Sequence, residues 1–559
     1  MNRLVNRRIR LLLAGLTIAF AGLVVRAVWL QGVRAASLSQ LGQTQHREVV
    51  TVPADRGTIY DRAGVELGLG ERATTVYANP MQITNPERAA VAVERTLGLD
   101  ANRLYKALGD RSRGFVYVER QADPAQADAL RRMKLAGFGF YPEQRRAYPQ
   151  RSVAAQVLGY VGIDGTGLSG LELQYDRDLS GRAGQETVVK DPAGTVIDIQ
   201  SQRPEVPGKA VYLTLDHSIQ ANAEEVLRET VHRWSAKSAS AIVLDPRTGA
   251  ILAMAIQPGY DANRYPSAPH DLQRNRTVTD TYEPGSTFKL ITVAGALSEG
   301  LVSPSTRFTL PYQLLVADRV IHDAEKRGTV NYSVGQILAH SSNIGAITLA
   351  EMLGRTRLND WIRRFGFGHT TGVDFPGESP GIVLPPDKWS GSTIGNVPIG
   401  QGIAVTPVQM AAAYAAIANG GVWSRPHLVD HVAGGARPSL HRHRLVSPRI
   451  ADQLMLMLKD VVAEGTGQYA AIPGYQVAGK TGTAQKPDSQ GGYATGRYVA
   501  SFVGAVPASR PRLVVLVTVD EPRGAIFGGV VAAPAFQQIA RFDLQYLEVP
   551  PDGAPGYQG

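Results

Sequence analysis

One short stretch of the chain places a serine and a lysine at a spacing suited to nucleophilic catalysis. Ser286 and Lys289 lie three residues apart within Glu-Pro-Gly-Ser-Thr-Phe-Lys, at the start of an apolar run that predicts a helix closing near Gly300. Residues three apart on a helix share one face. A serine hydroxyl needs a base to become a good nucleophile, and a buried lysine with a lowered pKa is such a base. Apolar neighbours on both sides of Lys289 favour its burial, although the pair alone also fits an ordinary helix surface.

Two further polar motifs are candidates to complete a site around Ser286. Ser341 and Asn343 form a Ser-x-Asn pair after a predicted helix, and Lys480 begins a Lys-Thr-Gly triplet on a predicted strand. Each motif alone is common in loops or at strand ends. In this chain order, Ser-x-x-Lys, Ser-x-Asn and Lys-Thr-Gly form the motif set of serine acyl-transferases. We therefore predict that Ser286 is the nucleophile of an acyl transfer.

The elements that must position these motifs can be read from hydrophobic periodicity and capping residues. They are a strand at Val211–Leu215, a helix capped by Asp216, a hairpin of Ser240–Leu244 and Ala250–Ala255, a helix opened by a capping box at Thr406, strands at Gln476–Gln485, Tyr498–Val506 and Leu513–Val519, and a helix from Pro534 to about Leu547. Strands, then helices, then strands and a last helix predict an α+β fold with one antiparallel sheet covered by helices.

Length and composition exclude several classes of protein. With 559 residues the chain is too long for one core, and 44% apolar against 19% charged residues is typical of a globular protein. It contains no cysteine, which excludes disulfides, cysteine-ligated zinc and a cysteine nucleophile. The net charge of +9 suits an anionic surface or polymer, but no basic-aromatic motif of a nucleic-acid reader is present. No metal-ligand cluster or phosphate-binding loop is recognisable, so we expect no metal and no cofactor.

The N-terminus carries a candidate membrane anchor. Residues 1–10 contain four arginines, and residues 11–30 are almost wholly apolar, long enough to cross a bilayer. The arginines place residues 1–10 in the cytoplasm and the rest of the chain outside, in a single pass across the cytoplasmic membrane. A cleaved signal peptide is the alternative, but Arg34-Ala35-Ala36-Ser37 is a weak cleavage site. We expect an uncleaved anchor.

The remaining chain divides into two folded domains and a tail. We expect a mixed α/β pedestal domain at 31–205, the catalytic domain at 206–547 and a C-terminal tail at 548–559. Within the pedestal, Arg47–Pro53 and Thr75–Ala78 resemble short strands. Its Arg-Gly-Thr-Ile-Tyr-Asp-Arg-Ala-Gly stretch, from Arg56, predicts a turn held by Arg–Asp pairing. No set of acid, base and nucleophile lies there, which indicates a scaffold or spacer.

Taken together, these motifs make the sequence resemble the penicillin-binding proteins, and more closely the class B, membrane-anchored D,D-transpeptidases of the septal (FtsI) type. The resemblance covers nearly the whole chain after the first ten residues. The stretches that carry it, besides the three catalytic motifs, are Arg56–Gly64, Tyr148-Pro149, Gly170-Leu171-Glu172, Gly400-Gln401-Gly402, Thr406-Pro407, Gly528-Gly529 and Ala532–Phe536. Asn343 is typical of the septal type, since elongation-type relatives usually carry Asp there. Asn396–Ile399 departs from the family's shorter Gly/aromatic lead-in.

The resemblance implies a role for each motif residue. Ser286 attacks the carbonyl of the penultimate D-Ala of a stem pentapeptide, and Lys289 takes its proton. Ser341, helped by Lys480, relays a proton to the leaving amine, while Asn343 binds the substrate backbone and helps hold Lys289. The expected substrate-binding residues are Thr481, Gly482 and Thr483. Backbone N–H groups of Ser286 and Thr483 are expected to form the oxyanion hole.

The same resemblance implies substrates, inhibitors and partners. We expect peptidoglycan stem peptides on lipid II-derived strands as substrates, β-lactams as covalent inhibitors, and a membrane glycan polymerase of the FtsW type with other division proteins as partners. An elongation- or sporulation-type transpeptidase is one alternative. A D,D-carboxypeptidase or β-lactamase-like hydrolase is another, although no carboxylate is recognisable that would activate a deacylating water. A signalling β-lactam receptor and a scaffold with a dispensable serine are further alternatives.

Overall fold

The structure, a computed structural model, describes most of the chain. The described residues are 2–34, 47–190, 196–437, 439–488 and 491–553. Two sequence-based expectations lie partly outside them, because residues 35–37 of the weak cleavage site and residues 554–559 of the expected tail are not described.

The described residues form two compact units. One comprises residues 1–55 and 181–208, and the other comprises residues 56–180 and 209–559. The expected domain boundaries at 30, 205 and 547 stay a prediction.

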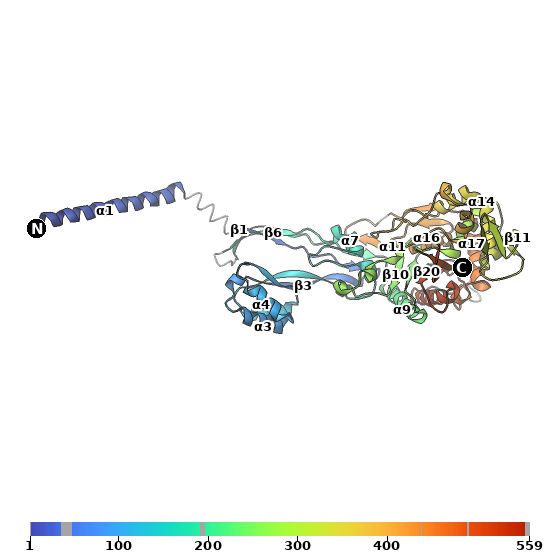
Figure 1. The fold of residues 1–559 in the computed structure, drawn as a ribbon, viewed down its shortest axis with the longest axis horizontal. Helices are drawn as coiled ribbons and strands as arrows, with labels where there is room; N and C mark the ends of the chain where they lie inside the picture. Colours follow the sequence, from blue (N-terminus) through green and yellow to red (C-terminus); the bar gives the residue numbers. More distant parts are fainter. Residues whose placement is uncertain (1, 35–46, 191–195, 438, 489–490, 554–559) are drawn as a thin grey trace. The chain divides into compact units, whose positions relative to one another are not determined.

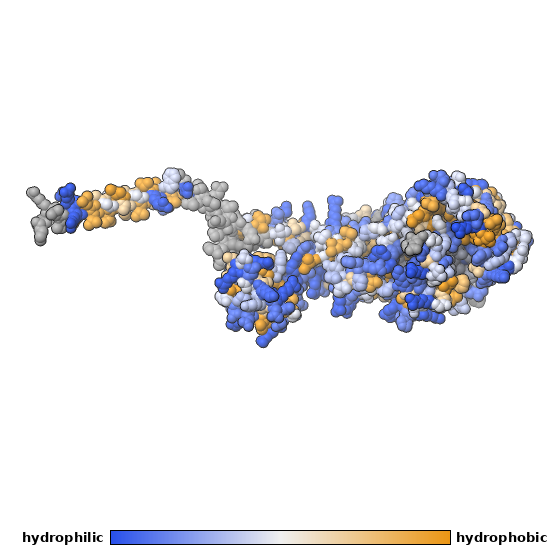
Figure 2. Space-filling view, viewed as in Figure 1, coloured by the Kyte–Doolittle hydropathy of each residue, from blue (hydrophilic) through white to orange (hydrophobic). Residues whose placement is uncertain are grey.

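The smaller unit contains the N-terminal helix and a small sheet. Helix α1 (Asn2–Val28) continues as one π-helical turn, η1 (Trp29–Val33). Figure 2 shows apolar residues along α1 with hydrophilic residues toward both ends. Residues Asn6–Gly32 are long and apolar enough to span a membrane, as expected. The sheet pairs β1 (Arg47–Val52), β6 (Gly184–Lys190) and β7 (Val196–Arg203) in antiparallel order, which confirms the strand expected at Arg47–Pro53.

The larger unit begins with a small α/β head built on a long strand. Strand β3 (Glu66–Ala78) pairs with β2 (Ile59–Tyr60), β4 (Val116–Ala122) and β5 (Phe138–Ala147), and it contains the expected strand at Thr75–Ala78. Helices α3 (Pro86–Leu97), α4 (Ala101–Gly109) and α5 (Pro124–Arg132) pack beside it, as Figure 1 shows for α3 and α4. Val76, Val93 and Leu108 belong to the separate hydrophobic core of this head.

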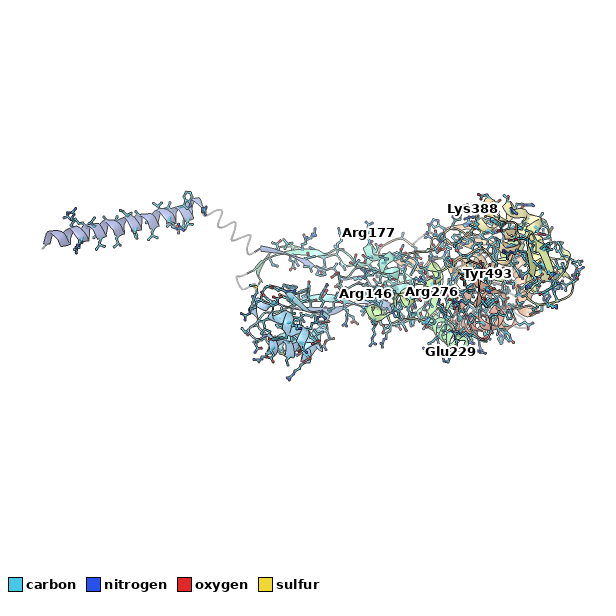
Figure 3. The ribbon with its side chains drawn as sticks, viewed as in Figure 1. Arg146, Arg177, Glu229, Arg276, Lys388 and Tyr493 are labelled. Atoms are coloured by element: carbon cyan, nitrogen blue, oxygen red, sulfur yellow. The ribbon has the colours of Figure 1, made fainter. Side chains whose placement is uncertain are left out.

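The expected pairing of Arg56 with a nearby aspartate is wrong. The Arg56 guanidinium instead contacts Glu172 at 2.8 Å and Asp176 at 2.7 Å. Asp61 is already occupied, because its carboxylate accepts two N–H groups of its own turn and contacts His217 Nδ1 at 2.6 Å. Glu172 also contacts the guanidinium of Arg146, labelled in Figure 3, at 2.6 Å. A buried ion network between distant segments therefore replaces the expected local pairing of Arg56, while the turn itself is held by Asp61.

The part of the larger unit that carries the Lys-Thr-Gly motif is built on a five-stranded sheet. Its strand order is β10-β9-β20-β19-β18, with every neighbouring pair antiparallel. The strands are β9 (Ser238–Leu244), β10 (Ile251–Gln257), β18 (Ala478–Pro487), β19 (Tyr493–Val506) and β20 (Leu513–Asp520). The expected hairpin and the three expected C-terminal strands are all confirmed.

Helices cover both faces of this sheet. Alternate residues of a strand point to opposite faces, and in β9 Ile242 belongs to one core cluster while Val243 belongs to another. Helices α12 (Lys289–Ser298) and α16 (Pro407–Ala418) contribute to the first cluster, and α9 (His217–Trp234) and α19 (Ala533–Tyr546) to the second. Asp216 caps α9 and Thr406 forms a capping box on α16, both as expected.

The other elements of the larger unit are short or connect these layers. They are η2 (Pro80–Gln82), α6 (Ala155–Leu158), α7 (Gly170–Gln174), α8 (Asp176–Leu179), β8 (Val211–Leu213), η3 (Ala262–Ser267), α10 (His270–Gln273), α11 (Arg276–Thr279), η4 (Gly285–Phe288), β11 (Arg307–Leu310), β12 (Gln313–Val316), β13 (Arg319–His322), β14 (Val330–Ser333), α13 (Val334–Ala339), α14 (Asn343–Arg364), η5 (Pro386–Lys388), α15 (Thr393–Asn396), η6 (Val397–Ile399), β15 (Val422–Ser424), β16 (Val429–Val432), β17 (Arg442–Arg444), α17 (Pro448–Ala463), η7 (Gln468–Ala470) and α18 (Gly528–Val531).

Candidate active site

The predicted nucleophile lies on a tight turn rather than within an α-helix. Ser286 belongs to the 3₁₀ turn η4, and α12 begins only at Lys289. The expected helix start at Ser286 is therefore three residues too early. A 3₁₀ turn has three residues per turn, so side chains at positions i and i+3 eclipse. The turn thus places Ser286, which is half-buried, and Lys289 on one side of the backbone.

Lys289 is held inside the protein by groups of the second motif. Its side chain is fully buried, as its apolar neighbours predicted. Its Nζ atom donates to the backbone oxygen of Ser341 at 2.5 Å and to Asn343 Oδ1 at 2.7 Å, and it lies 3.2 Å from Ser341 Oγ. Burial lowers the pKa of Lys289 to about 7, although the negative charge of Asp323 opposes this effect. The amine is therefore poised to be neutral near physiological pH.

The partners of Lys289 also direct its lone pair. The backbone oxygen of Ser341 and Oδ1 of Asn343 can only accept hydrogen bonds. A neutral amine has two N–H groups and one lone pair, so both N–H groups are engaged by these two oxygens. The lone pair is then left for a hydroxyl, and Ser341 Oγ is within reach at 3.2 Å. This arrangement can pass a proton between Lys289 and a serine hydroxyl.

The loop that carries the second motif is strained and capped. Ser341 lies between α13 and α14 with φ of +56°, a left-handed conformation that is costly for a non-glycine residue. Ser342 Oγ caps α14 by accepting the N–H of Gly345 at 3.1 Å. Strain of this kind persists only where surrounding contacts hold the backbone, and here the contacts with Lys289 help to do so.

A buried carboxylate, which sequence reasoning missed, lies at the start of α14. Asp323 accepts the N–H of Asn343 at 2.5 Å and the N–H of Ile344 at 3.1 Å. It also pairs with the Arg327 guanidinium, whose Nε lies at 2.9 Å. A carboxylate at a helix N-terminus is stabilised by the free N–H groups and the helix dipole. Nothing local in the His-Asp-Ala-Glu sequence around Asp323 indicated this contact, because 20 residues separate it from Asn343.

The third motif lies on a strand, as predicted, and this strand, β18, is at the edge of the five-stranded sheet. Lys480 is fully buried, and its Nζ contacts Thr481 Oγ1 at 3.3 Å and Thr466 Oγ1 at 3.5 Å. Burial and the nearby charge of Lys289 hold the pKa of Lys480 well below its usual value. The effect of Lys289 on Lys480 indicates that the first and third motifs lie in one site, because such repulsion acts only at short range inside a protein.

Thr481 of the triplet and Thr483 just after it lie on one face of β18, because they are two residues apart on a strand. Thr481 Oγ1 lies 2.7 Å from Thr466 Oγ1, and Thr483 Oγ1 accepts the N–H of Gly528 at 3.0 Å. Thr466 was not singled out from the sequence. The paired hydroxyls next to Lys480 form a small polar surface suited to a carboxylate.

Gly482 and Gly285 allow strand β18 to approach the η4 turn that carries Ser286. A Cβ added to Gly482 would lie 2.9 Å from Pro284 O, and one added to Gly285 would lie 2.8 Å from Thr483 O and 3.3 Å from Thr483 N. These distances show that the backbones of η4 and β18 are in direct contact. The third motif is therefore adjacent to Ser286, and Gly482 has a packing role there.

A second glycine contact supports the turn from the other side. Gly285 N donates to Gly400 O at 3.1 Å, and a Cβ added to Gly400 would lie only 2.1 Å from Gly285 O. Glu283 Oε1 accepts the N–H of Gly402 at 2.8 Å and lies 3.3 Å from the hydroxyl of Tyr493, labelled in Figure 3. The Gly-Gln-Gly stretch thus holds the turn that presents the serine.

A cavity of about 300 Å³ adjoins this turn. Two of its lining residues are close in the chain to motif residues. Glu283 precedes Ser286 by three positions, and Gln485 follows Thr483 by two. Arg276, on its rim, is labelled in Figure 3. The residues that line it include none of Ser286, Lys289, Ser341, Asn343 and Lys480, so the cavity lies next to the turn and not at the three motifs themselves.

One group elsewhere in the described part of the chain could offer metal ligands. Asp61, Asp216 and His217 lie within 4.8 Å of one another. Asp61 accepts backbone N–H groups and contacts His217, and Asp216 accepts two N–H groups as the cap of α9. These contacts give the three residues a structural role at the start of α9.

Comparisons with known proteins agree with this geometry. Residues 239–541 match the family model of the penicillin binding protein transpeptidase domain, and residues 51–213 match that of the penicillin-binding protein dimerisation domain. The chain is 32% identical to peptidoglycan D,D-transpeptidase FtsI of Escherichia coli strain K12, over 98% of this chain and 93% of that protein. It is 33% identical to stage V sporulation protein D of Bacillus subtilis strain 168, over 98% of this chain and 87% of that protein. Its structure resembles the crystal structure of penicillin binding protein 3 from Mycobacterium tuberculosis complexed with aztreonam, with a TM-score of 0.71 and 31% identity over 90% of this chain and 98% of that chain.

Proposed function

The chain belongs to the class B penicillin-binding proteins and is a peptidoglycan D,D-transpeptidase, and from that premise we propose that Ser286 is its nucleophile and that it acts at the division septum. The observation that carries the first proposal is the buried Lys289, whose Nζ contacts Ser341 and Asn343 and whose pKa is lowered to about 7.

Acylation is the first step of the proposed mechanism. Lys289 takes the proton of Ser286 as Oγ bonds to the carbonyl carbon of the penultimate D-Ala of a stem peptide. The bond between this carbon and the nitrogen of the terminal D-Ala then breaks. Ser341, which lies 3.2 Å from Lys289 Nζ, relays the proton to the leaving amine. An ester on Ser286 and free D-Ala result.

Transfer is the second step. An amine of a neighbouring stem peptide attacks the ester carbon, loses a proton through the same relay, and releases Ser286 Oγ. The product is an amide cross-link between two peptides, and the enzyme returns to its starting state. A β-lactam enters the first step and leaves Ser286 acylated.

The remaining motif residues bind the substrate and stabilise charge. Thr481 and Thr483, beside buried Lys480, hold the terminal carboxylate, and Gly482 lets this strand approach the serine turn. The N–H groups of Ser286 and Thr483 form the oxyanion hole, a feature worth about 3–4 kcal/mol per donor in other enzymes. Asn343 holds the substrate backbone and Lys289.

The septal assignment is supported by Asn343 and by the similarity to a relative named FtsI. We further propose that the N-terminus lies in the cytoplasm, that the catalytic part lies outside, and that an FtsW-type polymerase and division proteins are partners. The similarity to stage V sporulation protein D keeps a sporulation role as the alternative. A fluorescent fusion in dividing cells tests the role, because septal enrichment supports it and purely lateral labelling contradicts it.

Topology can be tested with single introduced cysteines, because the chain contains none. A membrane-impermeant thiol reagent applied to intact cells, or to spheroplasts where an outer membrane is present, should label Ser305→Cys and leave Asn6→Cys unlabelled until the membrane is permeabilised. The opposite pattern contradicts the proposed orientation.

The nucleophile is tested by intact mass and peptide mapping of the full chain in detergent after incubation with a penicillin. We expect a long-lived adduct on Ser286 that is absent in Ser286→Ala. Ser298→Ala on α12 is the matched control, because its buried Oγ has no hydrogen-bond partner among the described residues. An adduct that clears within minutes contradicts transfer and indicates a hydrolase. Absence of any adduct in folded protein contradicts the serine mechanism and leaves a scaffold.

A further inference from the structure

We propose that Asp323 is a positioning residue of the acyl transfer, which orients Asn343 and places a negative charge within electrostatic reach of Lys289. The proposal rests on the proposed roles of Ser286 and Lys289. Asp323 lies directly after β13, outside the three catalytic motifs. It is 5% exposed, and no step of the mechanism above uses it.

Asp323 holds the backbone at the start of α14. Its Oδ1 accepts the N–H groups of Asn343 at 2.5 Å and Ile344 at 3.1 Å, and both its oxygens lie 3.2 Å from Ser342 Oγ. The carboxylate therefore contacts Ser342 and Asn343 of the second motif and Ile344, which follows it. Loss of this anchor would free the loop whose carbonyl and amide oxygens hold Lys289.

The residue before Asp323 orients the Asn343 side chain. Asn343 Nδ2 donates to the backbone oxygen of His322 at 2.9 Å. A backbone oxygen can only accept, so the NH₂ group of Asn343 must face it, and Oδ1 must face Lys289 Nζ at 2.7 Å. The β12–β13 hairpin thus fixes both the backbone and the amide orientation of Asn343.

Asp323 also acts on Lys289 through its charge. The charge of Asp323 raises the pKa of Lys289, and the charge of Lys289 in turn lowers the pKa of Lys480 on β18. Tyr414 of α16 lies nearby but is neutral, because burial raises its pKa and its hydroxyl donates to Thr287 O at 2.8 Å. The Asp323 carboxylate favours the protonated form of Lys289, and burial favours the neutral form. Arg327, paired with Asp323, moderates the carboxylate's effect.

Opposite shifts are therefore expected for two substitutions. Asp323→Asn removes a negative charge, so Lys289 loses its proton more readily and the acidic midpoint of the acylation rate moves to lower pH. Arg327→Met removes the positive charge that moderates Asp323, so this midpoint moves to higher pH. We expect each shift to be roughly half a pH unit or more, and Asp323→Asn to lower the plateau rate about tenfold because Asn343 is less well held.

The experiment measures the second-order rate of acylation by a fluorescent penicillin as a function of pH, with the full chain in detergent. Asp323→Glu keeps the charge and should keep the midpoint near that of the wild type, even if its longer side chain lowers the plateau. Asp318→Asn is the matched control, because this aspartate of the same hairpin has a side chain 79% exposed. It should leave both midpoint and plateau unchanged.

Opposite midpoint shifts for Asp323→Asn and Arg327→Met support the proposal, since general destabilisation cannot produce opposite signs. Unchanged midpoints in both variants overturn it, as do midpoint shifts of the same sign in Asp323→Asn and Arg327→Met. Failure of the underlying serine mechanism looks different, because the wild-type chain would then form no adduct on Ser286 at any pH.

Discussion

Lys289 Nζ lies 2.7 Å from Asn343 Oδ1, although 54 residues separate the two in the chain. This contact joins the first catalytic motif to the second. Lys289 begins α12 and Asn343 begins α14, so the two side chains that we propose to be catalytic project from the starts of two helices. Rigid elements of this kind hold catalytic groups more precisely than loops do.

The acylation rate of the wild-type chain should depend on pH through Lys289. The pKa of Lys289 is about 7, so below this pH its amine carries a proton and cannot accept the one from Ser286. We expect the second-order rate of penicillin acylation to fall about tenfold for each pH unit below the midpoint. Stopped-flow measurements between about pH 5 and about pH 9 test this expectation. A rate independent of pH across this range would show that Lys289 is not the base.

Lys480 should be needed for acylation but not for folding. Its Nζ contacts are long, at 3.3–3.5 Å, and burial disfavours its charge. We therefore expect Lys480→Met to retain or raise the melting temperature while acylation falls about 100-fold or more, because the bound carboxylate favours the charged form of Lys480 and loses this partner. Lys459→Met on α17, which removes a contact between Lys459 Nζ and Gln476, is the control and should acylate normally. Equal acylation by both variants would remove Lys480 from the site.

Gly400 should support the serine turn through close backbone packing. An added Cβ would lie 2.1 Å from Gly285 O, and Gly400 has φ of +80°. Gly400→Ala should displace Gly285 and lower the acylation rate about tenfold or more, because small displacements of a nucleophile strongly affect rate. Gly420→Ala is a matched control with φ of +62° and no atom within 4 Å of its added Cβ. If both variants lose the same activity, left-handed strain rather than the displaced turn is the cause.

Glu172 should stabilise the larger unit far more than a surface carboxylate does. Its side chain is fully buried and pairs with Arg56 and Arg146. Glu172→Gln leaves two buried cations without this partner, so we expect the free energy of unfolding to fall by about 3–5 kcal/mol. Glu71→Gln breaks the exposed pair with Arg145 and should change it by less than about 1 kcal/mol. Thermal unfolding of both variants measures the difference, and similar melting temperatures would contradict a structural role for the network.

Much of the secondary structure could be predicted because its signals are local. Asp216 and Thr406 cap the helices that follow them, since a cap depends on contacts within three residues. Alternating and apolar runs likewise predicted the strands of the five-stranded sheet. The start of α12 was placed three residues too early at Ser286, because periodicity does not distinguish a 3₁₀ turn from the first turn of an α-helix.

The sequence by itself determined the reactive residue types, their spacing and their order along the chain. Ser286 and Lys289 are close because both lie within one turn of backbone, and this follows from spacing alone. The tertiary structure decided which distant groups surround them. Asp323 reaches Asn343 and Arg56 reaches Glu172 only because the folded backbone brings together segments 20 and 116 residues apart. Such contacts depend on the packing of whole elements, which leaves no local signal in the sequence.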